Sequence, residues 1–135
     1  MSRIKICGLR RPEDIEAVNA AKPDYCGFIV ECPKSRRSID RATLRELVRG
    51  LQKEIVPVGV FVNVPKELVA ELLEEGTIQI AQLHGQESQE YILELKKMTE
   101  KPLIQAFSVK TREDVERARE SAADYILLDQ GSGGT

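Results

Sequence analysis

A thiol, a guanidinium, an imidazole and a carboxylate each follow a short apolar run of this sequence. Groups of these types can exchange protons with a small molecule or hold an anion, which makes them candidates for a reactive site. Single occurrences are weak evidence, but here all four follow the same kind of segment. In chain order they are Cys7, Arg37, His84 and Asp129.

Each of these side chains also has an ordinary structural explanation. A lone cysteine that closes a strand is commonly a small buried hydrophobe, and arginines in a polar loop are commonly solvated. A loop histidine often bonds a backbone carbonyl, and an aspartate often caps a turn. The structural explanation is retained for the other candidates, which are Cys26, Cys32, Arg36, Asn63 and Ser108.

Six runs rich in β-branched and other apolar residues predict strands. Most are nearly continuous in apolar residues, which is typical of strands covered on both faces in a parallel sheet. The predicted strands are residues 3–7, 25–30, 56–62, 78–83, 103–107 and 125–128.

Five amphipathic stretches between these runs predict helices. Leu44, Leu47, Val48 and Leu51, for example, recur with helical spacing. Start and stop signals agree with the pattern. Pro12 and Pro65 suit a first helical turn, Thr111 with Asp114 resembles a capping box, and Gly76 is a plausible helix stop.

Regular alternation of strand and helix predicts parallel strands joined by right-handed crossovers. The spacing fits either a doubly wound open sheet or part of a (β/α)₈ barrel. The turn after the first strand lacks the G-x-G-x-x-G pattern of dinucleotide-binding folds. In both architectures the carboxyl ends of the strands meet on one face, so the four candidate side chains are expected around one pocket.

Composition excludes several classes of protein. The 135 residues are 41% hydrophobic with a net charge of −2, which suits one folded domain and argues against a nucleic-acid-binding domain. No apolar run approaches the roughly 20 residues of a membrane helix, and the first residues lack a signal-peptide pattern. Three cysteines without a CxxC pair make a disulfide framework or zinc site unlikely and favour a cytoplasmic location.

Five segments together resemble the phosphoribosylanthranilate isomerases of tryptophan biosynthesis. They are KICGLRRPEDI, VECPKSRRSI, VGVFVN, AQLHG and LLDQGSGGT, in that order along essentially the whole chain. The resemblance implies a (β/α)₈ barrel that isomerises N-(5′-phosphoribosyl)anthranilate by an Amadori rearrangement, without metal or cofactor. For this chain the resemblance implies an α/β fold, an incomplete (β/α)₈ barrel of six strands and five helices.

The resemblance also implies roles for particular residues. Cys7 of KICG corresponds to the general base, and Asp129 of LLD corresponds to the general acid. Arg37, which follows the KSR element, corresponds to the residue that faces the anthranilate carboxylate. Gln82 and His84 of QLHG are implied to lie beside the substrate. To play these roles, Cys7 has to be a thiolate and Asp129 has to be a protonated acid.

The chain is shorter than a complete barrel of this class, which has about 200 residues or more. The last two strands and three helices of the barrel are expected to be absent, and with them the usual phosphate-binding loops. The 135 residues are therefore expected to form a single domain that is inactive alone. A complementary carboxyl-terminal fragment or a second copy is the expected protein partner.

Three alternatives remain open at this point. The related aminoaldose isomerase of histidine biosynthesis runs the same rearrangement, but its pattern has aspartates for both acid and base. A non-catalytic half-barrel would act in assembly through its open sheet edges. A doubly wound phosphate-binding domain would differ in the order of its strands.

Overall fold

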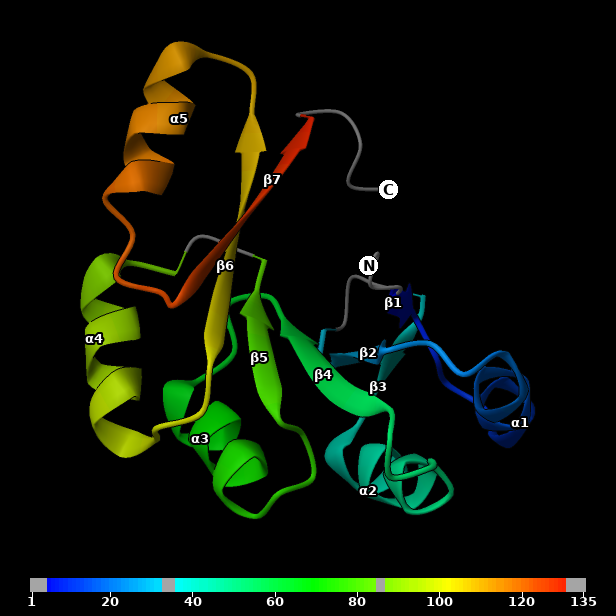
Figure 1. The fold of residues 1–135 in the computed structure, drawn as a ribbon. Coiled ribbons are helices and arrows are strands. Elements are labelled where there is room, and N and C mark those ends of the chain that lie inside the picture. The colour runs from blue at the N-terminus through cyan, green and yellow to red at the C-terminus, as the bar shows by residue number, and fades with distance from the viewer. Residues whose placement is uncertain (1–4, 33–35, 85–86, 131–135) are drawn as a thin grey trace.

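The structure is a computed structural model that describes residues 5–32, 36–84 and 87–130, with the backbone alone for residues 129 and 130. Strands and helices alternate along these residues (Figure 1). The elements are β1 (Lys5–Cys7), α1 (Pro12–Ala21), β2 (Tyr25–Val30), β3 (Ser38–Ile39), α2 (Arg41–Arg49), β4 (Val56–Phe61), α3 (Lys66–Glu74), β5 (Ile80–Leu83), α4 (Gln89–Met98), β6 (Leu103–Val109), α5 (Arg112–Arg119) and β7 (Tyr125–Gln130).

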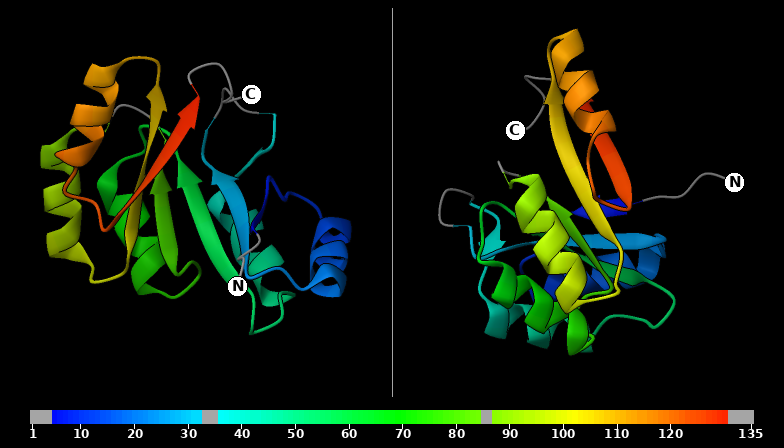
Figure 2. Two further views of the ribbon diagram at one scale, coloured as in Figure 1. Left: turned by 45° about the horizontal axis from the view of Figure 1, so that its top comes forward. Right: turned by 90° about the vertical axis from the view of Figure 1, so that its left-hand side faces the viewer.

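The described strands form one parallel sheet whose order follows the chain. The order is β1-β2-β4-β5-β6-β7, with β3 paired to β2 beside this path. A doubly wound sheet would reverse its strand order part of the way along, so that alternative is wrong. The helices lie around the outer side of the curved sheet, and β1 and β7 end the sheet order (Figures 1 and 2).

The hydrophobic core lies between the sheet and its helices. On β2, the helix-facing residues Cys26, Phe28 and Val30 have no exposed surface. Tyr25 and Ile29 of the same strand lie on the opposite, inner face and are only partly buried. The inner face is the side on which a barrel of this type would enclose its layered interior.

The strand and helix predictions are confirmed, with small differences at the ends of elements. The strand predicted at 78–83 begins at Ile80, and the strand predicted at 103–107 continues to Val109. Pro12 is the first residue of α1, whereas Pro65 lies one residue before α3 as its N-cap. The two-residue strand β3 was not predicted, because two residues carry too little pattern to detect.

Two predicted helix signals have the expected local geometry. Thr111 and Asp114 form a reciprocal capping box at the start of α5. Gly76 follows α3 with a φ of +85°, and its N–H donates to the carbonyl of Leu73 at 3.2 Å. The next N–H, of Thr77, donates to the carbonyl of Leu72 at 3.1 Å, which completes a Schellman motif.

Candidate functional site

The carboxyl ends of the strands carry most of the residues selected from the sequence. Cys7 pairs with Gly27, and Gly27 pairs with Val58, so these three positions share one face of the sheet. Alternation along β1 places Lys5 on the same inner face as Cys7. Cys7 is exposed on this face, whereas Cys26 and Cys32 are buried. Only the first of the three thiols is therefore open to a small molecule.

Gly27 makes room for the thiol of Cys7. A Cβ atom on residue 27 would lie 2.7 Å from Cys7 Sγ and 3.1 Å from Lys5 Cε. Since real Cβ atoms do not approach other heavy atoms at 2.7 Å, only glycine fits there without a shift. The sulfur and the lysine stem thus lie together over the backbone of β2.

Arg37 is brought next to the end of β1 by the short strand β3. Ser38 pairs with Ile29 of β2, and its Oγ accepts a hydrogen bond from the Cys32 N–H at 2.7 Å. The Arg37 side chain then lies over Gly8, where a Cβ would be 2.8 Å from Arg37 Cδ and 3.1 Å from Nη1. The unpredicted strand therefore places a predicted residue beside the residue that follows Cys7.

The loop that carries Arg37 is also tied to the loop after β1. The Arg10 guanidinium donates to the carbonyl of Arg36 at 3.0 Å, and the Gly8 N–H donates to the carbonyl of Gly27 at 2.9 Å. Arg36 is exposed, in keeping with its reading as a solvated charge. Lys34, which precedes these arginines, lies outside the described residues.

Gln82 lies on the inner face of β5 and is only 5% exposed. Its Oε1 accepts a hydrogen bond from Lys5 Nζ. His84 directly follows β5, is half-buried, and donates its backbone N–H to the carbonyl of Phe61 at 2.8 Å. Lys5 was not among the residues predicted from the sequence. Its position two residues before Cys7, which puts both side chains on one face of a strand, was the available signal.

Residue 129 lies in β7, where it pairs in register with Ser108 of β6. Its ladder position therefore belongs to the same face as Ser108, near the carboxyl end of the sheet. The side chain of Asp129 lies outside the described part of the chain, as does the segment 131–135. Ser108 is exposed.

Burial and nearby charge shift the pKa values of two groups at this site. The ammonium of Lys5 is desolvated by its surroundings, which lowers the pKa of Lys5, while attraction to Cys7 acts in the opposite direction. The residue as a whole is still exposed, because its stem lies along the open face. Burial raises the pKa of Cys26 to about 12, so this neighbouring thiol stays neutral.

A buried carboxylate supports the loop that follows β4. Glu87 is 7% exposed and accepts a hydrogen bond from the Asn63 N–H at 2.7 Å. Asn63 has a φ of +53°, and the hydroxyl of Tyr91 donates to the next carbonyl, of Val64, at 2.6 Å. The loop at this end of the sheet is thus held from the α4 side, a role that sequence reasoning missed because the partners are distant in the chain.

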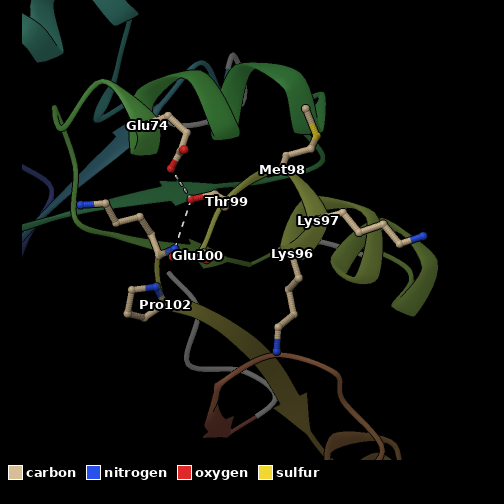
Figure 3. A pocket seen from close by; sticks show the side chains of 8 residues that line it. Glu74, Lys96, Lys97, Met98, Thr99, Glu100 and Pro102 are labelled. Carbon is tan, nitrogen blue, oxygen red and sulfur yellow. Dashed lines mark hydrogen bonds between the residues drawn. The ribbon is translucent and has the colours of Figure 1, made fainter.

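A hollow of about 560 Å³ lies at the other end of the sheet, beside the start of β6 (Figure 3). Its polar groups bond one another. The hydroxyl of Thr99 donates to Glu74 Oε2 at 2.8 Å and accepts from the Lys101 N–H at 3.1 Å. Catalytic groups of parallel α/β folds gather at the carboxyl ends of strands, so this hollow is not the candidate site.

The described residues contain neither a candidate metal site nor a membrane-spanning helix. Within residues 5–32, 36–84 and 87–130, no three His, Cys, Asp or Glu side chains come together in a way that could hold a metal ion. No helix in that part of the chain has the length and apolar character needed to span a membrane. The described groups at this site are the thiol of Cys7, the cations Lys5 and Arg37, and the buried amide of Gln82.

Known proteins resemble this chain over nearly all of its length. A relative from Acetivibrio thermocellus, named N-(5′-phosphoribosyl)anthranilate isomerase, is 43% identical over 96% of this chain and 61% of its own. The relative of that name from Caldanaerobacter subterraneus is 39% identical over all of this chain and 66% of its own. The chain thus spans less than two-thirds of the length of these curated relatives.

Solved structures agree with this comparison. The phosphoribosyl anthranilate isomerase of Thermus thermophilus is 36% identical, with a TM-score of 0.82 over 99% of this chain and 65% of its own. A second isomerase, solved in complex with reduced 1-(o-carboxyphenylamino)-1-deoxyribulose 5-phosphate, is 33% identical, with a TM-score of 0.80 over 96% of this chain and 66% of its own. The family model described as N-(5′-phosphoribosyl)anthranilate (PRA) isomerase matches residues 4–135. The chain therefore belongs to the N-(5′-phosphoribosyl)anthranilate isomerase family.

Proposed function

We propose that this protein isomerises N-(5′-phosphoribosyl)anthranilate to 1-(2-carboxyphenylamino)-1-deoxyribulose 5-phosphate in tryptophan biosynthesis. The observation that carries the proposal is the family match across residues 4–135, together with an exposed Cys7 at the carboxyl end of β1. The related structure with the reduced product analogue supports a phosphosugar as the substrate class. Curated relatives carry the name of the anthranilate enzyme, which favours it over the isomerase of histidine biosynthesis.

Asp129 is the proposed general acid. The reaction begins with opening of the ribose ring, in which the bond between C1 and the ring oxygen breaks as a Schiff base forms at C1. A protonated carboxyl gives its proton to the leaving ring oxygen, which becomes a hydroxyl. The position of residue 129 at the carboxyl end of β7, on the face it shares with Ser108, supports this role.

Cys7 is the proposed general base. After ring opening, the thiolate takes the proton from C2, and the electron pair of that C–H bond moves to neutralise the Schiff base nitrogen. The resulting enolamine then tautomerises to the aminoketose. The reaction is a redistribution of protons and electrons within one molecule, so the proposal includes neither metal nor cofactor. The exposed thiol beside cations supports this role.

Arg37 is the proposed partner of the anthranilate carboxylate. A guanidinium can form two parallel hydrogen bonds with a planar carboxylate. Its position over Gly8, next to Cys7, supports a substrate that spans both residues. His84 is proposed to lie beside the substrate at the end of β5. Gln82 is proposed to act at the same site through Lys5, since its Oε1 already accepts from Lys5 Nζ.

We propose this activity for a protein in which this chain supplies both the general acid and the general base. The curated relatives are longer, with 61% to 66% of their length covered. We propose that the 135 residues alone turn over little or no substrate and need a complementary polypeptide. A test compares the chain alone with the chain joined to the carboxyl-terminal third of the Acetivibrio thermocellus relative. Turnover by the chain alone at the rate of the joined protein would contradict this part.

The roles of the residues are tested in the joined protein by single substitutions. General acid–base groups contribute about 10²–10⁴-fold, so Cys7→Ala and Asp129→Asn should each reduce kcat by at least 10²-fold. Arg37→Lys should mainly raise KM, because the lysine keeps the charge but not the two parallel bonds. A Cys7→Ala protein that retains most of its activity would contradict the assignment of the base. Circular dichroism spectra control for loss of the fold.

A further inference from the structure

We propose that Lys5 is a positioning residue whose ammonium is the counter-ion of the Cys7 thiolate, and that Gln82 holds this ammonium in place. The proposal deepens the proposed function, because it names the group that keeps the base in its reactive form. It is tested by the chemistry of the thiol itself. Its outcome can therefore be separated from the outcome of the activity assay.

The geometry of β1 brings the side chains of Lys5 and Cys7 together. Lys5 and Cys7 are two residues apart in β1, so they point to the same face of the sheet. A single point, the position of a Cβ on Gly27, lies 3.1 Å from Lys5 Cε and 2.7 Å from Cys7 Sγ. Lys5 Cε and Cys7 Sγ are therefore no farther apart than these two distances combined, and the ammonium nitrogen is one bond beyond Cε. Opposite charges at such separations stabilise one another appreciably.

The ammonium of Lys5 is anchored by a buried amide. Lys5 Nζ donates to Oε1 of Gln82, a side chain that is only 5% exposed. Gln82 lies on β5, two strands farther along the sheet from β2, so the lysine reaches across the inner face rather than into solvent. A neutral amide oxygen orients the ammonium without cancelling its charge. A carboxylate at residue 82 would instead neutralise Lys5 and leave the thiol without its counter-ion.

Other groups near Cys7 do not replace Lys5. Arg37 lies over Gly8 and is a second cation, but its guanidinium is assigned to the substrate carboxylate, which would neutralise it in the complex. Cys26 on β2 is a neutral thiol, and Tyr25, which pairs with Lys5, carries no positive charge. Lys5 is thus the described cation that stays available to the sulfur when substrate is bound.

Desolvation and attraction to Cys7 act on the Lys5 ammonium in opposite directions. The ammonium of Lys5 is desolvated, which lowers its pKa, and the attraction of Cys7 opposes this effect. When Cys7 takes a proton from the substrate, the S–H bond forms and the lysine keeps all three of its own protons.

The experiment measures the rate at which iodoacetamide alkylates Cys7 between pH 5 and pH 10 in the 135-residue chain. Peptide mapping by mass spectrometry assigns the label, since Cys26 and Cys32 are buried. Only the thiolate reacts, so the rate follows the ionised fraction of Cys7. Lys5→Met removes the charge at similar length and should move the midpoint of the curve up by about one pH unit, which is about tenfold slower labelling at pH 6.

Lys5→Arg retains the charge and should keep most of the labelling rate. Lys97→Met, on the exposed surface of α4, is the matched control and should reproduce the unsubstituted curve. A Lys5→Met curve that coincides with the unsubstituted one overturns the proposal, whatever the activity of the enzyme. If circular dichroism shows that Lys5→Met is unfolded, the same labelling curve is measured on Gln82→Met. It frees the ammonium, so an unchanged curve overturns the proposal and a shift of the same sign supports it.

Discussion

Cys7 and Gly27 are partners in the β1–β2 ladder, and the sulfur of Cys7 occupies the space that a side chain on Gly27 would need. The distance from Cys7 Sγ to the position of a Cβ at residue 27 is 2.7 Å. The pair therefore links the placement of a proposed catalytic group to the absence of a side chain on the next strand.

Gly27→Ala should displace the Cys7 sulfur and destabilise the chain. Forcing an extra methyl group into a packed site typically destabilises by about 1–3 kcal/mol. Urea denaturation gives the change in the free energy of unfolding, and iodoacetamide labelling reports the altered Cys7. Gly50→Ala is the matched control, since a Cβ there meets Ile15 Cγ2 at 3.5 Å, an ordinary contact. Equal stability of the two variants would show that the sulfur moves freely.

Gly8→Ala should be more destabilising than Gly76→Ala. Both glycines have a left-handed backbone, with φ of +87° and +85°, which disfavours alanine by about 1–2 kcal/mol. A Cβ at residue 76 meets no atom within 4 Å, whereas one at residue 8 meets Arg37 Cδ at 2.8 Å. The difference between the two variants in urea denaturation measures the contact with Arg37. In a chain that also carries Arg37→Ala, Gly8→Ala should destabilise no more than Gly76→Ala. If Gly8→Ala remains the more destabilising change in that chain, the contact with Arg37 is not the cause.

Glu87→Ala should weaken the loop that follows β4. The substitution removes the carboxylate that accepts from the Asn63 N–H, and a hydrogen bond to a charged group contributes about 1.5–3 kcal/mol. Glu87→Gln keeps an acceptor oxygen and should lose less. Hydrogen exchange at the Asn63 amide is the direct measurement and should accelerate in the alanine variant. Glu90→Ala, on the exposed surface of α4, is the control. Unchanged exchange at Asn63 in Glu87→Ala would contradict the support assigned to this carboxylate.

Three aspartates at helix starts should make the stability depend on acidity. Hydrogen bonds from the backbone N–H groups of Arg10, Thr43 and Lys110 lower the pKa values of Asp14, Asp40 and Asp114, respectively. Each folded-state pKa lies below the unfolded value of about 3.9, so the unfolded chain binds protons more tightly. The stabilisation is therefore complete above about pH 4 and is lost as the pH falls through the lowered values.

Replacing these three aspartates with asparagine should flatten this part of the pH profile. Asparagine keeps a capping oxygen but does not titrate in this range. The free energy of unfolding, measured in urea at a series of pH values from 2 to 6, is the observable. Replacing the exposed Glu13, Glu46 and Glu113 with glutamine provides a control of equal charge change. A triple aspartate variant whose stability falls as steeply as that of the unsubstituted chain would rule out these carboxylates as the cause.

Much of the fold follows from short-range patterns. Continuous apolar runs predicted the six main strands, and stripes such as Leu44 with Leu47 predicted the helices between them. Thr111, Asp114 and Gly76 act within a few residues of themselves, so their roles were also predicted from local sequence. The strand order was left open, because a doubly wound sheet and a barrel segment share the same alternation of elements. Hydrogen-bond pairing between strands decided it.

The candidate site divides in the same way. Cys7 and Arg37 were identified as candidates from their types and positions, and the family resemblance suggested their roles. The contact of Arg37 with Gly8 depends on β3, whose two residues form a strand only because β2 is beside them. The bonds from Lys5 to Gln82 and from Asn63 to Glu87 join residues 77 and 24 positions apart.

By itself, the sequence determined which elements form, which family the chain resembles and which side chains could do chemistry, because periodicity, capping and motif spacing are local properties. Only the tertiary structure decided the order of the strands, the position of the Arg37 side chain over Gly8 and the neighbours of the Cys7 sulfur. The physical reason is that these relationships depend on sheet register and on the space left where glycine has no side chain. Neither leaves a periodic trace along the chain.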